Sequence, residues 1–196
     1  MPKGGRVEHL SFRKAEPGDC FLLFVPSSKE HQALAPLIKK FQDHHGGRLV
    51  PIVHLTCQRF SIEGQDVDRI LAHLSQHLCS HPFPVIAYSY AIATSRFNRR
   101  SVLHWQLNDD SPWYAFRDQV DACLRKIDLM PQYTHLIKGH LTLLYEINDN
   151  PVSEELASLL PQTVFEARTL KLSRMNASLG FDDLGSFELQ PCVQSL

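Results

Sequence analysis

The tripeptide His-Leu-Thr occurs twice in this sequence, in two apolar stretches that read VHLTCQRF at 53–60 and GHLTLLYE at 139–146. In a β-strand, alternate side chains point to the same face, so each copy would present a histidine and a threonine together. Two imidazoles with pKa values near 6.5 can act as base and acid on opposite sides of a phosphorus atom. Threonine hydroxyls can donate to the non-bridging oxygens. We therefore predict catalytic roles for His54 and His140 and phosphate binding by Thr56 and Thr142.

A looser pattern, His-Leu followed by serine or threonine, is not specific, because His-Leu-Ser also occurs at 9–11 and at 73–75. The first of these lies in an irregular lead-in. The second lies in an amphipathic helix, where residues i and i+2 point in different directions. A structural role is the alternative for any single buried histidine. The recurrence of His-Leu-Thr in a matching strand of the second half favours a pair that acts together.

The elements that would position these residues follow the same order in both halves of the chain. Each half reads as strand, helix, His-Leu-Thr strand, helix and strand. This order predicts one domain with two pseudo-symmetric lobes around a cleft, at roughly 20–95 and 101–190, after a lead-in over 1–19. The expected strands lie at 20–26, 48–60, 83–93, 101–107, 135–147, 163–175 and 186–192, and the expected helices at 27–44, 65–79, 111–127 and 153–160.

The composition is that of a globular protein, with 43% hydrophobic and 21% charged residues and a net charge of −1. The near-neutral charge argues against a protein that coats nucleic acid through a basic surface. The N-terminus has no apolar signal region and no apolar run is long enough to cross a bilayer. The five cysteines are scattered and odd in number, which favours a reducing, cytoplasmic location. Nothing indicates a membrane or an obligate protein partner.

Several further residues are candidate substrate contacts. The segment TSRFNRRS at 94–101 places an aromatic ring among guanidinium groups, a combination that can stack a base and hold phosphate, although a solvated charged turn is the alternative. A lysine two residues before the second histidine could reach a phosphate or lie at the rim. Two other residues each follow a motif histidine by five positions. These candidates are Phe97, Arg99, Arg100, Lys138, Arg59 and Tyr145.

No cofactor or metal is predicted. His77 and His81 are four apart and His44 adjoins His45, but a zinc site usually needs three or four ligands with cysteine or carboxylate support. These histidines are expected on helix surfaces. The sequence contains neither a P-loop nor a dinucleotide-binding glycine motif.

The paired motifs resemble the two-histidine (2H) phosphoesterase superfamily, and more narrowly its 2'-5' RNA ligase-like cyclic phosphodiesterases. That family carries two H-x-[ST]-x motifs, which HLTC and HLTL match here, and the order of elements extends the resemblance from about residue 20 to 189. Cys57 departs from the usual aliphatic residue, and the strand alternation predicts that it faces the core.

The resemblance implies a bilobal α+β fold in which antiparallel sheets line a central cleft and helices lie outside. It also implies metal-independent hydrolysis of a 2',3'-cyclic phosphate, usually to a 2'-phosphate, on RNA termini or small cyclic nucleotides. A 2'-5' RNA ligase or 2'-5' phosphodiesterase would use the same two histidines. A module that binds nucleotides or RNA ends without turnover is a further alternative.

Overall fold

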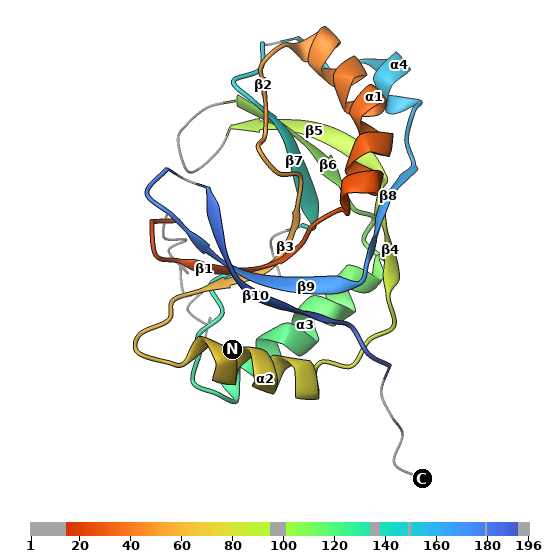
Figure 1. Cartoon of the computed structure of the whole chain (residues 1–196). Helices are drawn as coiled ribbons and strands as arrows, with labels where there is room; N and C mark the ends of the chain where they lie inside the picture. The colour runs from red at the N-terminus through yellow and green to blue at the C-terminus, as the bar shows by residue number, and fades with distance from the viewer. Residues whose placement is uncertain (1–14, 95–100, 134–137, 149, 179, 192–196) are drawn as a thin grey trace, which may run out of the picture.

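The computed structural model describes residues 15–94, 101–133, 138–148, 150–178 and 180–191 (Figure 1). These residues form helices and antiparallel strands, which confirms the predicted α+β class. In chain order the elements are β1 (Cys20–Phe24), α1 (Ser28–His45), β2 (Arg48–Leu49), β3 (Leu55–Phe60), α2 (Val67–His77), β4 (Phe83–Ala87), β5 (Ser89–Thr94), β6 (Ser101–Gln106), α3 (Pro112–Arg125), β7 (His140–Tyr145), α4 (Glu154–Ala157), β8 (Gln162–Ala167), β9 (Thr169–Met175) and β10 (Phe181–Glu188).

The longer helices begin where local sequence signals place them. Ser27 caps α1 in a capping box with Glu30, in which each side chain bonds to the backbone N–H of the other residue. Ser111 caps α3, and Pro112 follows in the first turn, where its missing N–H costs nothing. Gly46 ends α1 with a φ of 66°. These starts agree with the sequence predictions.

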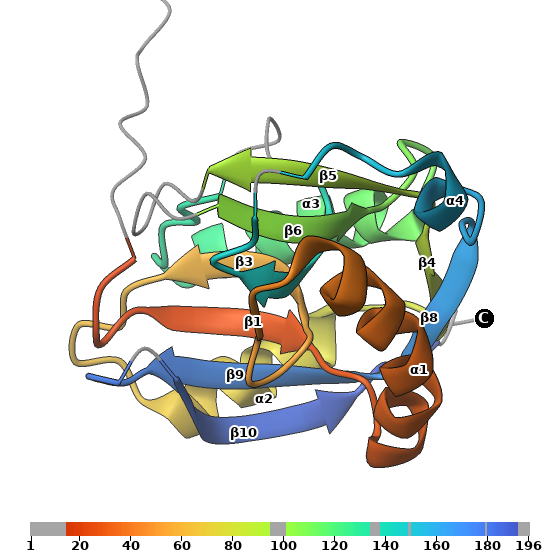
Figure 2. The same cartoon turned by 90° about the horizontal axis from the view of Figure 1, so that it is seen from above.

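The main sheet has the strand order β10-β9-β1-β3-β7-β6-β5, with β2 beside β7 (Figures 1 and 2). The two His-Leu-Thr strands, β3 and β7, are direct neighbours at its centre. Strand pairing crosses the boundary between the two halves of the sequence. The late strands β9 and β10 extend the side that carries β1 and β3, whereas the early strand β5 pairs with β6.

Two predicted strands are each divided in the structure. The expected strand at 83–93 breaks at Tyr88 into β4 and β5, and the expected strand at 163–175 breaks at Arg168 into β8 and β9. In both cases the first part joins the separate two-stranded sheet β4-β8 and the second part joins the main sheet. Because the residues at the two breaks are tyrosine and arginine and not glycine or proline, the strand-like sequence pattern continues through both breaks.

The helices pack on the face of the main sheet opposite the motif histidines. On α1, Phe41 makes edge contacts with Trp105 of β6 and Tyr90 of β5. Helices α2 and α3 lie together beneath the half of the sheet formed by β1, β3, β9 and β10 (Figure 1). Leu55 and Leu141 point into this core and are fully buried. Among the described residues, no helix is long and apolar enough to cross a membrane.

Candidate active site

The four motif residues lie on one face of the main sheet, which we call the histidine face. Burial alternates along both strands, with partly exposed histidine and threonine on either side of a buried leucine. Leu55 pairs with Leu141 in antiparallel register. His54 and His140 each immediately precede one member of this pair, so the two imidazoles are carried at neighbouring strands.

Both motif imidazoles are oriented in the same way. Nδ1 of His54 lies 2.9 Å from the carbonyl oxygen of Ile52, and Nδ1 of His140 lies 2.9 Å from the carbonyl oxygen of Lys138. A carbonyl oxygen only accepts hydrogen bonds, so Nδ1 is the protonated nitrogen in each ring. Nε2 of each ring is therefore the nitrogen without a hydrogen in the neutral form, and it can accept a proton. In both motifs, the ring is oriented by the backbone carbonyl of the residue two positions before the histidine.

Both motif strands contain a β-bulge at the residue after the threonine. In β3, Thr56 pairs with Leu23 and Gln58 with Leu22, which leaves Cys57 as the additional residue. The β7 strand has its additional residue at Leu143, between the pairs that Thr142 and Leu144 make with β6. A bulge shifts the alternation by one position. As a result, the residues five positions after each histidine return to the histidine face.

These returning residues are two of the candidate substrate contacts. Arg59 pairs with Phe21, is almost fully buried, and places its guanidinium carbon 5.5 Å from the ring centre of Tyr133. Tyr145 is partly buried and pairs with Val102. Burial raises the pKa of the Tyr145 phenol, so the group stays neutral at physiological pH.

The remaining candidate contacts divide into two groups. Lys138 lies just before β7, and its ammonium nitrogen is 3.1 Å from a carboxylate oxygen of Asp109 in an exposed ion pair. Phe97, Arg99 and Arg100 lie outside the described residues. Cys57 faces the core as expected, and burial raises the pKa of its thiol well above the ordinary value.

His54 lies against an aromatic ring from the other end of the chain. The ring of Phe181, the first residue of β10, makes an edge contact with the imidazole at a centroid distance of 5.3 Å. Burial lowers the pKa of His54 below its ordinary value, and the nearby charge of His140 acts in the same direction, against the opposing hydrogen bond to Ile52. His54 is thus biased towards the neutral form that a general base requires.

His104 of β6 is a third histidine on the same face and lies outside the two His-Leu-Thr motifs. It pairs with Thr142, and its ring centroid is 5.2 Å from that of His140. Burial, together with the charge of His140, lowers the pKa of His104 to about 4. In the sequence, His104 is only a histidine within an expected strand. Its relation to the motif residues is seen once β6 is known to pair with β7.

The backbone that precedes His140 is tightly enclosed from the helical side. The N–H of Gly139 donates to the Tyr114 hydroxyl at 3.2 Å, and its carbonyl oxygen accepts from the N–H of Leu107 at 2.9 Å. A Cβ atom at Gly139 would meet the ring of Trp113 at 2.9 Å and Leu107 at 2.7 Å. Glycine is therefore required at this position by close packing.

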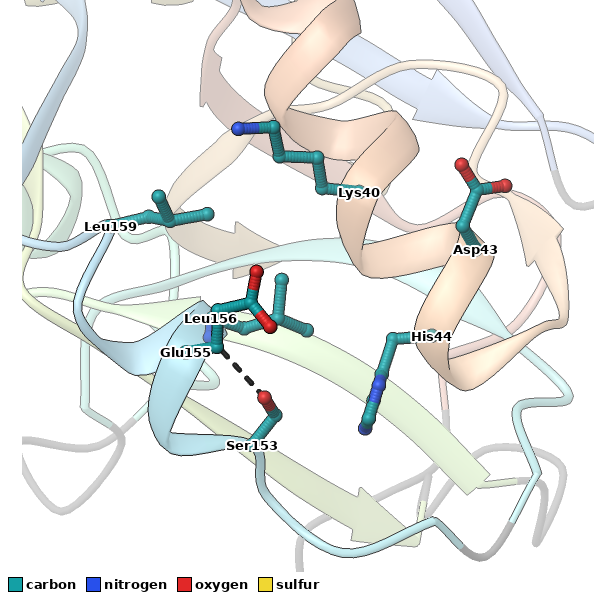
Figure 3. A pocket seen from close by; sticks show the side chains of 7 residues that line it. All are labelled: Lys40, Asp43, His44, Ser153, Glu155, Leu156 and Leu159. Atoms are coloured by element: carbon teal, nitrogen blue, oxygen red, sulfur yellow. Dashed lines mark hydrogen bonds between the residues drawn. The ribbon is translucent and has the colours of Figure 1, made fainter.

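A separate hollow of about 410 Å³ lies between α1 and α4, away from the motif strands (Figure 3). Lys40, Asp43 and His44 line it from α1, and Glu155 lines it from the α4 side. Its lining mixes positive, negative and apolar groups and contains none of the predicted site residues. Within the described part of the chain, no group of three or more His, Cys, Asp or Glu side chains could hold a metal ion.

The chain matches no protein-family model and no curated protein sequence, but it is similar to solved structures. The TT0787 protein of Thermus thermophilus aligns with a TM-score of 0.62 and 15% identity over 88% of this chain and 98% of that one. Escherichia coli LigT in apo form gives 0.60 and 14% identity over 90% and 99%. Kluyveromyces marxianus Usb1 with uridine monophosphate gives 0.51 and 14% identity over 88% and 98%.

These similarities extend over nearly the whole length of the compared proteins, so they concern the complete fold. They show that this chain has the two-lobed α+β fold of LigT and Usb1, as the resemblance of the paired motifs implied. At 13–15% identity they show the fold alone.

Proposed function

We propose that this protein is a metal-independent phosphodiesterase that hydrolyses 2',3'-cyclic phosphates on RNA termini or small nucleotides. The observation that carries the proposal is the matched presentation of two imidazoles. His54 and His140 lie on one sheet face, and each has its Nδ1 hydrogen occupied by a backbone carbonyl. Binding alone does not need two proton-transfer groups arranged in this way, whereas displacement at phosphorus needs a base and an acid.

The proposed reaction begins with neutral His54, whose Nε2 accepts a proton from water. The resulting oxygen nucleophile attacks phosphorus, and the bond from phosphorus to one ribose oxygen breaks. Protonated His140 donates its Nε2 proton to that leaving oxygen, so the charges and protons balance. Hydroxyl donors from Thr56 and Thr142 stabilise the non-bridging oxygens, where negative charge accumulates. If the 3' oxygen leaves, the product is a 2'-phosphate.

The named structural neighbours support a nucleotide substrate. LigT has been crystallised with 3'-AMP, with ATP and with phosphate, and Usb1 with uridine monophosphate. The proposed membership of the 2H phosphoesterase superfamily rests on this shared fold together with the HLTC and HLTL motifs. The four cysteines in the described part of the chain are free thiols, which is consistent with a cytoplasmic enzyme.

The proposal is tested by incubating the protein with adenosine 2',3'-cyclic phosphate in the presence of EDTA and separating the products. We expect a 2'-phosphate product and a loss of about 10²- to 10⁴-fold in kcat for His54→Ala and for His140→Ala, since each removes a proton-transfer group. His31→Ala is the matched control, because His31 is exposed on α1. Wild-type turnover in either motif variant would overturn the assignment. Activity only on 2'-5'-linked RNA would favour the ligase-type alternative.

A further inference from the structure

His104 occupies a position on the histidine face that the two motifs do not account for. It lies on β6 directly opposite Thr142, a proposed phosphate ligand, and its ring is in contact range of His140. Its strand neighbours Leu103 and Trp105 are fully buried on the other face of the sheet. The side chain is therefore directed to the same face as the motif residues, one strand further out.

A short chain of hydrogen bonds fixes how this ring is presented. The Ser89 hydroxyl donates to Oε1 of Gln106 at 3.2 Å, which leaves the Gln106 amide nitrogen directed at Nε2 of His104 at 3.4 Å. Nε2 is then the accepting nitrogen and Nδ1 carries the hydrogen. Within the described part of the chain, the Gln106 amide is the only group that forms a hydrogen bond with the His104 ring.

We propose that His104 is a third phosphate-contacting residue, which donates its Nδ1 hydrogen to a non-bridging oxygen of the phosphoester beside Thr142. This inference rests on the proposed function and deepens it, since it assigns the site a neutral donor in addition to the two threonine hydroxyls. The ligand it fits is a nucleotide phosphoester anion.

The charge of the ring suits that role. Since burial and the charge of His140 lower the pKa of His104 to about 4, the ring is neutral across the physiological range. A lysine or arginine here would repel the protonated form of His140 and reduce the fraction of His140 that carries the proton to be donated. A neutral imidazole supplies a hydrogen bond to the phosphate without that penalty.

The test uses two substitutions that separate the hydrogen bond from the packing. His104→Asn keeps an N–H donor close to the place of Nδ1, whereas His104→Phe keeps a planar ring and removes the donor. We expect kcat/KM for adenosine 2',3'-cyclic phosphate to fall by about 10- to 100-fold in His104→Phe, the range for a lost hydrogen bond to a charged group. His104→Asn should recover most of that loss. Thermal unfolding of both variants controls for damage to the fold.

The pH–rate profile distinguishes a donor from a titrating group. In His104→Asn both limbs should stay where the wild type has them, because His104 does not change its charge during turnover. Loss of one limb would overturn the proposal by making His104 an acid or base. Wild-type kcat/KM in His104→Phe would also overturn it, while leaving the proposed function intact.

Direct binding separates this inference from the proposed function. If the wild type does not hydrolyse the cyclic phosphate, titration calorimetry with adenosine 2'-monophosphate still measures the phosphate contact. Binding that is at least about 10-fold weaker in His104→Phe and recovered in His104→Asn would support His104 in a site without turnover. Equal affinity of wild type and His104→Phe, or no binding by the wild type, would overturn the inference.

Discussion

Substituting Gly139 by alanine tests whether the backbone before His140 is as closely enclosed as the structure indicates. The added Cβ would lie 2.9 and 3.0 Å from two ring carbons of Trp113 and 2.7 Å from a methyl carbon of Leu107. Carbon atoms in favourable contact are about 3.5–4.0 Å apart. The leucine methyl can rotate away, but the indole is 2% exposed and packed on all sides. Relief therefore requires the backbone of Gly139 to move by about 0.5–1 Å, the difference between these distances and a favourable contact.

The expected effects follow from that displacement. Overpacking of this kind costs about 1–3 kcal/mol of unfolding free energy, against which the lower chain entropy of alanine returns only about 0.4–1 kcal/mol. His140 is the next residue, and its Nδ1 hydrogen bond runs to the residue before Gly139. A shift approaching 1 Å in a catalytic group can cost about 10²-fold in rate. We expect Gly139→Ala to lose about 1–2 kcal/mol of stability and about 10- to 100-fold in kcat.

Urea unfolding and steady-state hydrolysis of adenosine 2',3'-cyclic phosphate measure the two effects. Gly180→Ala is the matched control. Gly139 directly precedes the motif residue His140, and Gly180 directly precedes Phe181, whose ring contacts the other motif histidine, His54. The Cβ added at Gly180 would approach Asn176 no closer than 3.4 Å. The control should keep kcat within about twofold and stability within about 0.5 kcal/mol. If Gly139→Ala unfolds and turns over like the wild type, the inferred enclosure of the strand is wrong.

Three further predictions concern pH and buried polar groups. Because burial lowers the pKa of His54, activity should be retained down to a pH below about 6.5 and then fall as the ring protonates, which a pH profile of kcat/KM measures. Phe181→Ala should admit water to His54, raise its pKa and move this acid limb to higher pH; an unmoved limb would contradict the assignment of His54 as the base. Gln58→Leu should cost about 3 kcal/mol or more in urea unfolding, because the Gln58 amide bonds both the N–H and the carbonyl of Tyr133 in a fully buried place, whereas exposed Gln162→Leu should be near neutral.

Local patterns in the sequence determined much of the secondary structure and the choice of candidate residues. The capping box at Ser27 and the serine–proline start of α3 placed two helices, since these signals act within one turn. The alternation around His54 and His140 predicted which side chains share a face, and the burial pattern agrees. These features depend on neighbours in the chain, so a single sequence contains them.

The breaks at Tyr88 and Arg168 depend on residues far away in the chain, so the local pattern does not predict them. Each lies inside a continuous strand-like run, and the chain changes sheets there because β4 and β8 pair with each other, although they are far apart in the sequence. Nothing within either run specifies that partner. The roles proposed for Phe97, Arg99 and Arg100 remain predictions, because these residues lie outside those that the structure describes.

Local sequence patterns are sufficient to find two histidine–threonine pairs and to predict that each pair shares a strand face. Three features come from the folded chain instead: β3 and β7 lie side by side, bulges at Cys57 and Leu143 return later residues to the same face, and His104 lies on that face as well. Strand order and bulges are set by packing between segments far apart in the chain, which no local periodicity encodes. The same packing makes Gly139 necessary, because the indole that excludes a side chain there comes from α3.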